Sequence, residues 1–161
     1  MSPLLEKINA AGKEFPVWMI VPSIKLSAPV VPATLRKVIM DGKTVDMWFA
    51  PDMEAAGWHT SSALPGEKGN LVFSGHNNDF GQVFSQLIDL KQGDIIQLIT
   101  QKGFHTYRVS NKVLFQEVEI DLSQRMENAR WISPSSDERI TLVTCWPYDS
   151  NTHRLVIVAA P

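Results

Sequence analysis

The sequence predicts a single, mostly β domain, built as a closed or nearly closed barrel of about eight strands with two or three short helices. Short apolar runs of strand length recur along the chain between clusters of turn-forming residues. Four of the ten prolines fall at positions 16, 22, 29 and 32, where they favour edge strands and bends. No long helical segments separate the strands, so a doubly wound parallel sheet is not expected.

The N-terminal half supplies an arm and the first strands. Residues 1–16 are expected to form an N-terminal arm with a short helix over Pro3–Ala11, and residues 17–161 a single folded domain. A hairpin is expected within Val38–Phe49, because Asp41-Gly42 is a turn signal flanked by alternating residues. Further strands are predicted over Val17–Val21, Ile24–Val31 and Leu71–Ser74.

The C-terminal half continues the pattern. Apolar spacing in Gly81–Leu90 predicts a short helix lying on the core, and Ser123–Trp131 is a second helical candidate. The last two strands are joined by the loop Trp146–His153. The predicted strands of this half are Ile95–Thr100, Thr106–Val118, Ile140–Cys145 and Leu155–Ala159.

Composition limits the classes of function. Fifteen Lys and Arg against 17 Asp and Glu give a net charge of −2, and no basic stripe is present, so nucleic-acid binding is not expected. The acidic residues Glu117, Glu119 and Asp121 are more simply a solvated face than a calcium site, and we expect no metal or other cofactor. The apolar run Val17–Val21 stops at Pro22, far short of the roughly 20 residues of a membrane-spanning helix.

Three chemically useful side chains lie at predicted strand edges. Cys145, the only cysteine, ends the strand Ile140–Cys145; Arg154 opens the next strand, and His76 follows the run Leu71–Ser74. A thiolate is a good acyl nucleophile, an imidazole can take and return a proton, and a guanidinium can stabilise an oxyanion. If the three converge at one end of the sheet, they supply the parts for acyl transfer through a thioester.

Each residue alone has a simpler interpretation. A lone cysteine on an apolar strand is usually a small buried hydrophobe, and a lone histidine after a strand is more often a turn or core residue. Arg154 alone would be a solvated charge at a strand end. His59 and His105 are interpreted as structural or surface residues, and His153 is ambiguous because it neighbours Arg154.

The combination resembles the sortase family. Thr141-Leu142-Val143-Thr144-Cys145, followed by Arg154 in the next strand, is similar to the TLXTC signature of that family with its downstream arginine. Gly75-His76 after an apolar strand is similar to the family's catalytic histidine motif. The stretch from Gly57 to Asn70 also resembles the usual approach to that histidine, and the resemblance extends from about Ile20 to Ala159.

The resemblance implies a cysteine transpeptidase on an eight-stranded β-barrel, with residues 17–161 as the catalytic domain. Cys145 would attack the threonine carbonyl of an LPXTG-like sorting signal, His76 would exchange protons with the leaving and incoming amines, and Arg154 would stabilise the oxyanion. Thr144 and Trp146 are expected to bind substrate, although a packed interior position suits Trp146 equally well.

The resemblance also implies partners and a location. The substrate would be the sorting-signal peptide of a secreted protein, and the acceptor an amine on a cell-wall precursor or a pilin. Sortases act on the extracellular face of the bacterial cytoplasmic membrane through an N-terminal anchor, which here would lie before Pro3. Asn77-Asn78 depart from the commonest pattern, and the short Cys–Arg loop points towards housekeeping-like or pilin- and sporulation-associated classes.

Two rival interpretations remain open. Another cysteine acyl-transfer enzyme fits poorly: an L,D-transpeptidase would place histidine and glycine just before Cys145, and a papain-like peptidase would place its cysteine early on a helix. The second rival is a catalytically silent β-barrel that binds peptides or cell-wall ligands. Thiol reactivity separates the second rival from an enzyme, because a catalytic Cys145 alkylates readily and a buried packing cysteine does not.

Overall fold

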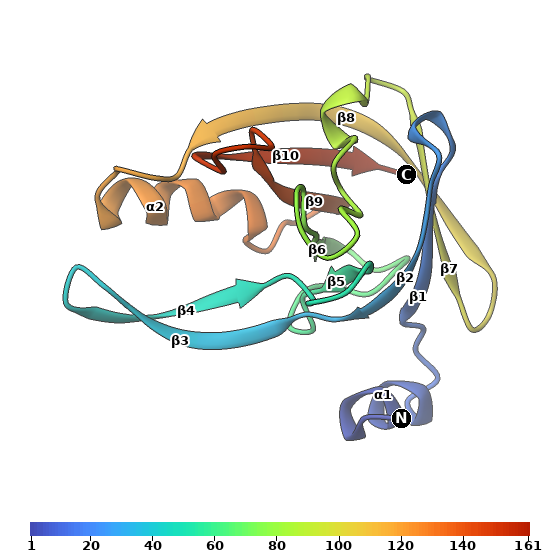
Figure 1. Ribbon diagram of the computed structural model, residues 1–161. Helices are drawn as coiled ribbons and strands as arrows, with labels where there is room; N and C mark the ends of the chain where they lie inside the picture. Colours follow the sequence, from blue (N-terminus) through green and yellow to red (C-terminus); the bar gives the residue numbers. More distant parts are fainter.

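The computed structural model describes all 161 residues as ten strands, two α-helices and three 3-10 turns. Eight strands close a barrel in the order β1-β2-β5-β6-β9-β10-β8-β7, and β3 and β4 form a separate hairpin (Figure 1). The strands are β1 Pro16–Val21, β2 Leu26–Pro32, β3 Thr34–Met40, β4 Lys43–Phe49, β5 Ala56–Trp58, β6 Gly69–Ser74, β7 Ile95–Thr100, β8 Phe104–Gln116, β9 Glu138–Trp146 and β10 His153–Ala160. The helices are α1 Pro3–Ala10 and α2 Leu122–Asn128, and the 3-10 turns are Pro22–Ile24, Leu87–Asp89 and Ala129–Ile132.

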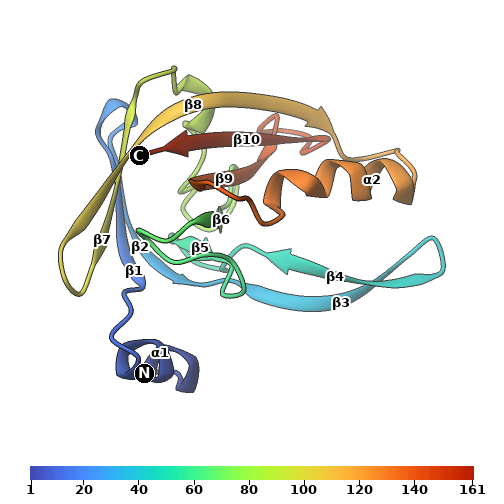
Figure 2. The same cartoon turned by 180° about the vertical axis from the view of Figure 1, so that it is seen from behind.

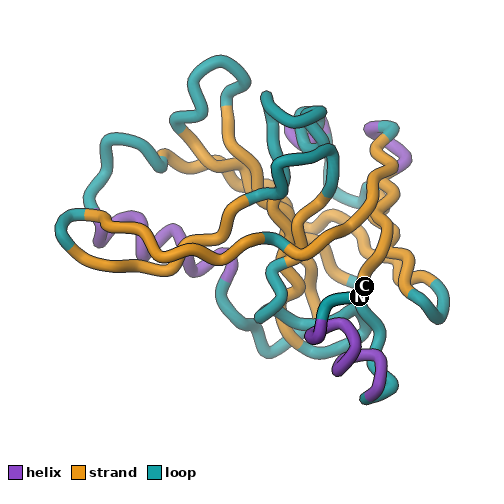
Figure 3. The backbone as a smooth tube through the Cα atoms, turned by 60° about the horizontal axis from the view of Figure 1, so that its bottom comes forward, coloured by secondary structure: helices purple, strands orange, loops and turns teal.

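The closed, mostly β barrel confirms the predicted fold class. The sequence pattern missed β5, a strand of three residues, and counted the hairpin among the barrel strands. The helices lie at the margins of the strand framework (Figure 3). No helix is long and apolar enough to span a membrane.

The helix predicted over Gly81–Leu90 is wrong in extent. Only Leu87–Asp89 forms a 3-10 turn, and the rest is loop. Phe80, Gly81 and Gln82 have φ of 46°, 83° and 59°, so the backbone is left-handed where the predicted helix would begin. The apolar spacing still buries Phe84, Leu87 and Leu90 in the core.

The barrel interior is one hydrophobic cluster built from alternate residues of its strands. Trp58, Phe73 and Tyr107 are among the largest fully buried side chains. Along β9, Ile140 and Leu142 face this cluster, so their neighbours face outwards. The outer face of β6, β9 and β10 is therefore the surface on which polar side chains can be displayed.

Two segments project from the same side of the barrel. The β3–β4 hairpin and α2 both extend beyond β6, β9 and β10 in the same direction, with α2 above the hairpin in Figure 1, and the view from behind agrees (Figure 2). At the hairpin tip, the Asp41 carboxylate accepts a hydrogen bond of 3.1 Å from the Leu122 N–H of α2. The hairpin and the helix thus enclose the outer face of these strands.

Candidate active site

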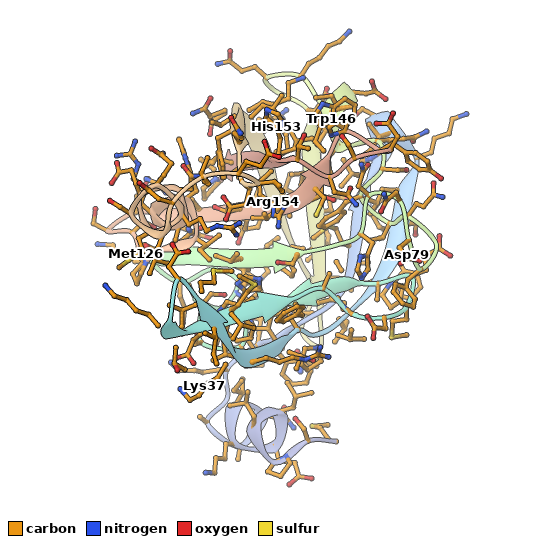
Figure 4. All side chains as sticks on the ribbon, turned by 60° about the vertical axis from the view of Figure 1, so that its left-hand side comes forward. Lys37, Asp79, Met126, Trp146, His153 and Arg154 are labelled. Atoms are coloured by element: carbon orange, nitrogen blue, oxygen red, sulfur yellow. The ribbon has the colours of Figure 1, made fainter.

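A cavity of about 460 Å³ lies between these two projections. Its floor comes from β6, β9 and β10, one wall from the hairpin, and the other from α2 and the 3-10 turn Ala129–Ile132. Figure 4 brings this side forward and places Arg154 at the middle of the face, with Met126 of α2 to its left and Lys37 of the hairpin below. Among its lining residues are Trp48, His59, Ser74, His76, Cys145 and Arg154.

Cys145 reaches the cavity because of strand alternation. It lies three residues after Leu142, which faces the core, and so points to the outer face of β9. The thiol is free and half-buried. A half-buried thiol at a cavity floor is accessible to a ligand, unlike a cysteine packed in a core.

Arg154 lies directly opposite Cys145. The antiparallel register of β9 and β10 pairs these two residues, and both line the cavity. Opposed residues in such a pair have Cβ atoms about 5 Å apart, so both side chains leave the cavity floor at the same place. The Arg154 Nη1 donates to the His153 carbonyl at 3.3 Å, which leaves the other donors of the guanidinium for a ligand.

His76 reaches the same cavity from the end of β6, which runs parallel to β9. Its backbone is fixed on both sides: the Gly75 N–H donates to the Val143 carbonyl at 3.1 Å, and the Phe84 N–H donates to the His76 carbonyl at 3.0 Å. A Cβ on Gly75 would lie 2.5 Å from Cδ2 of Phe84, so only glycine fits before this histidine. The three predicted catalytic residues therefore meet in one cavity.

The His76 ring has few polar contacts. Its centroid lies 5.0 Å from that of Phe80, and its Nε2 lies 4.0 Å from the Asp52 carboxylate, beyond hydrogen-bond distance. The Nε2 atom has no hydrogen-bond partner, although the side chain is 26% exposed. Asp52, in the loop before β5, was missed by sequence reasoning because nothing in its local pattern marks it.

The two predicted substrate-binding residues are placed differently. Thr144 lines the cavity, but it is buried and its hydroxyl donates to the Gly75 carbonyl at 2.8 Å, so it supports the backbone before His76. Trp146 does not line the cavity; it packs against the hydrophobic core.

The loops after His76 and Cys145 are joined to each other. The Asn78 amide donates to the Tyr148 carbonyl at 2.5 Å, and the Gln82 amide donates to the Tyr148 hydroxyl at 3.0 Å. These two contacts hold the loop that follows His76 (the histidine loop) beside the loop that connects Cys145 to Arg154. They give Asn78, one of the residues that departs from the usual family pattern, a structural role.

His59 also belongs to the cavity, which sequence reasoning missed. It is only 3% exposed, its ring stacks on Trp48 with centroids 4.5 Å apart, and its Nε2 lies 2.6 Å from the Ser74 hydroxyl. Burial lowers the pKa of His59 to about 4, so the ring is neutral at physiological pH. The position of His59, ahead of a turn-rich loop, gave no signal of this setting.

Of the other residues that the sequence singled out, His105 lies outside the cavity and Glu117 lines it. His105 contacts the Glu14 carboxylate at 3.1 Å, away from the cavity, and the pKa of Glu14 is lowered chiefly by hydrogen bonds from Thr100 and then His105. Glu117 lines the α2 side of the cavity and accepts a hydrogen bond of 3.0 Å from Asn128. No group of three or more metal-ligating side chains comes together.

Comparisons with known proteins show the family of this chain. The family model for the sortase domain matches residues 19–161. Sortase A of Bacillus anthracis is 27% identical over 138 residues, covering 85% of this chain and 55% of that protein. Sortase A of Listeria monocytogenes is 30% identical over 92 residues, covering 56% of this chain and 37% of that protein. The chain thus spans about half, or less, of the length of these curated relatives.

Solved structures extend the likeness to the fold. Sortase A from Corynebacterium diphtheriae, in a lid mutant, superimposes with a TM-score of 0.67 at 26% identity, over 96% of this chain and 75% of that one. Sortase A from Listeria monocytogenes gives a TM-score of 0.65 at 24% identity, over 91% of this chain and 86% of that one. Because the family model covers most of the residues and includes the whole cavity floor, the chain belongs to the sortase family.

Proposed function

We propose that this chain is a cysteine transpeptidase that cleaves an LPXTG-like sorting signal through a thioacyl-enzyme and transfers the acyl group to an amine. The observation that carries the proposal is the pairing of Cys145 with Arg154 across β9 and β10, in a cavity that His76 also lines. Membership of the sortase family supports the same chemistry. Residues 17–161 would be the catalytic unit.

The first half-reaction forms the thioester. The Cys145 thiolate attacks the carbonyl carbon of the signal's threonine, and the carbonyl oxygen becomes an oxyanion within reach of the Arg154 guanidinium. As the tetrahedral intermediate collapses, the C–N bond breaks and the His76 imidazolium gives its proton to the leaving amine. The threonine carbonyl is then bonded to the Cys145 sulfur, and His76 is neutral.

The second half-reaction reverses the proton transfer. The acceptor amine attacks the thioester carbonyl while neutral His76 takes its proton, and Arg154 again faces the oxyanion. Collapse of this intermediate breaks the C–S bond and returns the Cys145 thiolate. Water can replace the amine, and the products are then those of slow hydrolysis.

The lining of the cavity suits a peptide with apolar side chains. Met47 and Phe49 of the hairpin and Met126 of α2 line the same cavity as Cys145. Burial of apolar peptide side chains between such walls supplies affinity without hydrogen-bond specificity. The motif's apolar residue would lie against these walls and its threonine at the thiol.

The partners and the location follow from the proposed reaction. The substrate would be the sorting-signal peptide of a secreted protein, and the acceptor an amine on a cell-wall precursor or a pilin subunit. Both occur outside the cytoplasm, so the enzyme would act at the extracellular face of the bacterial cytoplasmic membrane, held there by an N-terminal anchor.

The test is mass spectrometry of the intact protein incubated with a small library of LPXTG-like peptides, with and without an added amine. We expect a covalent adduct on Cys145 that the amine releases as a ligated product. The matched control is Cys145→Ala, which keeps most of the small apolar volume and should form no adduct while remaining folded. No adduct and no alkylation of Cys145 would contradict the proposal and favour the silent-barrel alternative.

A further inference from the structure

The β3–β4 hairpin forms one wall of the cavity, yet no backbone ladder joins it to the barrel. Each of its strands pairs only with the other. At its base, the Ala33 N–H donates to the Trp58 carbonyl at 2.8 Å, and Gly57 packs so closely on Pro51 and Ala33 that a Cβ would clash. Beyond this base, side-chain contacts must set the position of the wall.

Trp48 makes such a contact near the base of the wall, in the second residue pair of the hairpin from its barrel end. Its indole stacks on the His59 imidazole with an interplanar angle of 16° and centroids 4.5 Å apart, and both residues line the cavity. Stacked aromatic pairs of this geometry stabilise a contact beyond the area they bury. The stack joins the hairpin to the barrel beside the cavity that His76 and Cys145 also line.

His59 itself is rigidly held by the barrel. Its N–H donates to the Val72 carbonyl at 2.9 Å, and its carbonyl accepts from both the N–H of Ser62, at 2.9 Å, and the hydroxyl of Ser62, at 2.6 Å. The Ser62 hydroxyl in turn accepts a 3.0 Å hydrogen bond from the Val72 N–H. An imidazole on such a base is a fixed surface against which the hairpin can rest.

The edge of the His59 ring faces β6, the strand that leads to His76. Nε2 of His59 lies 2.6 Å from the Ser74 hydroxyl, and Ser74 is two residues before His76 on the chain. A phenyl ring would offer the flat face but no edge nitrogen, and a short polar side chain would offer the nitrogen or oxygen but no face. A neutral imidazole provides both contacts at once.

We infer that His59 is a positioning residue that sets the width of the peptide groove, by holding the Trp48 wall of the hairpin at a fixed distance from the strand that leads to His76. The inference rests on the proposed transpeptidase function for its kinetic consequence, but its structural part does not need any substrate. A wider or mobile groove loses contacts with the peptide before the reaction. The Cys145 thiol and its paired residue Arg154 make no hydrogen bond to His59 or Trp48 and keep their places on β9 and β10.

The experiment compares His59→Ala, His59→Phe and Trp48→Leu with the parent protein. Three quantities are measured: KM and kcat for a turned-over peptide, the rate of Cys145 alkylation, and hydrogen–deuterium exchange of residues 34–49. We expect His59→Ala and Trp48→Leu to raise KM by about three- to tenfold, the range that loss of an aromatic stack implies. Exchange in 34–49 should accelerate in both, while alkylation of Cys145 stays within about twofold.

His59→Phe is the rescue variant, since it keeps the stack and loses only the contact with Ser74. It should restore most of the protection of residues 34–49, which the stack provides, but only part of the parent KM, because the contact with Ser74 is lost. His105→Ala is the matched control, because it removes a histidine held by a polar partner outside the cavity and should change neither quantity.

Unchanged KM and unchanged exchange of residues 34–49 in Trp48→Leu would overturn the inference, as would a His59→Phe variant in which residues 34–49 exchange as fast as in His59→Ala, or one whose KM equals that of the parent. Trp48→Leu alters only the hairpin side of the stack, so it remains informative if His59→Ala does not fold. Exchange of residues 34–49 is measured without substrate. If no peptide is turned over, the transpeptidase proposal fails while the exchange data still decide the role of His59.

Discussion

The floor of the cavity and its hairpin wall are built in opposite ways. Cys145 and Arg154 sit on strands joined by seven consecutive paired positions, and β6 extends this sheet towards His76. The hairpin pairs with no barrel strand; it is attached at its base and through the Trp48 stack, and its tip contacts α2 through Asp41. Backbone ladders thus place the reacting groups, and side chains place the surface that would recognise the peptide.

The difference extends to burial. Leu155 and Ile157 of β10 are buried in the core, whereas Leu35 and Ile39 of the hairpin are 47% and 78% exposed. Segments with few buried apolar contacts open locally at lower free energy than core strands do. Substitutions in the floor should therefore change kcat, and substitutions in the hairpin should change KM, which gives the comparison a kinetic test.

Arg154→Lys tests the floor most severely. Lys keeps the positive charge but cannot reproduce the planar fork of the guanidinium, so we expect kcat to fall by about 10²–10³, as for the loss of one oxyanion donor. Single-turnover kinetics with the peptide measure it. Arg108→Lys, at the opposite end of the β8–β10 ladder, is the control. Near-normal turnover in Arg154→Lys would show that Arg154 is a surface charge with no role in stabilising the oxyanion.

The pH dependence of stability tests whether His59 is buried between the hairpin wall and the cavity floor. The pKa of His59 is lowered from 6.5 to about 4 by burial, so between these values the unfolded chain binds a proton that the folded chain does not. The free energy of unfolding should therefore fall as the pH drops from about 6.5 to about 4, by up to about 3 kcal/mol. Urea unfolding across this range measures the slope.

The control for this slope is His59→Phe, which has no titrating ring at that position. Its free energy of unfolding should depend less steeply on pH in the same window, with the contribution of all other groups unchanged. Parallel curves for the parent and His59→Phe would show that His59 titrates normally and is not buried in solution.

Thr144→Val tests whether the hydrogen bond from Thr144 to Gly75 positions His76 for catalysis or only stabilises the fold. The valine cannot donate to the Gly75 carbonyl, so we expect a loss of about 1–2 kcal/mol of stability together with a lower kcat. Thr141→Val on the same strand removes a buried hydrogen bond of 2.6 Å to Asn70 and should cost similar stability with kcat retained. Equal kcat values for the two variants would refute the supporting role of Thr144.

Asp41→Gly gives the smallest effect and probes the hairpin tip. Glycine tolerates the φ of 49° at this position but cannot accept the Leu122 N–H, so α2 loses a partner worth about 0.5 kcal/mol. Hydrogen exchange at the tip should accelerate, with KM changed less than about twofold. Lys37→Ala breaks the exposed ion pair with Asp46 inside the hairpin and should leave the tip contact intact.

The sequence predicted the floor far better than the wall. Alternation along Ile140–Cys145 and Leu155–Ala159 predicts strands with one buried face, and the matching TLXTC pattern pointed to Cys145 and Arg154. Those features are local, so a single sequence carries them. The convergence of His76 was an inference from strand order, which the closed barrel supports.

The parts that the sequence did not reveal depend on long-range packing. His59 looks like an ordinary surface or structural histidine until Trp48 is placed over it, and Asp52 carries no pattern of its own. Trp146 directly follows Cys145, yet alternation turns it away from the thiol and onto the core. Proximity in sequence is a poor guide to proximity in a site that strands assemble.

The pairing of Cys145 with Arg154 also bears on how such an enzyme can be altered. The loop 147–152 connects the two strands, and their buried faces specify the same register as the loop does. Loops of other lengths can therefore be grafted between the strands without separating the thiol from the guanidinium, if Tyr148 or an equivalent keeps its hold on the histidine loop. A single residue inserted within either strand would instead turn one of the pair into the core.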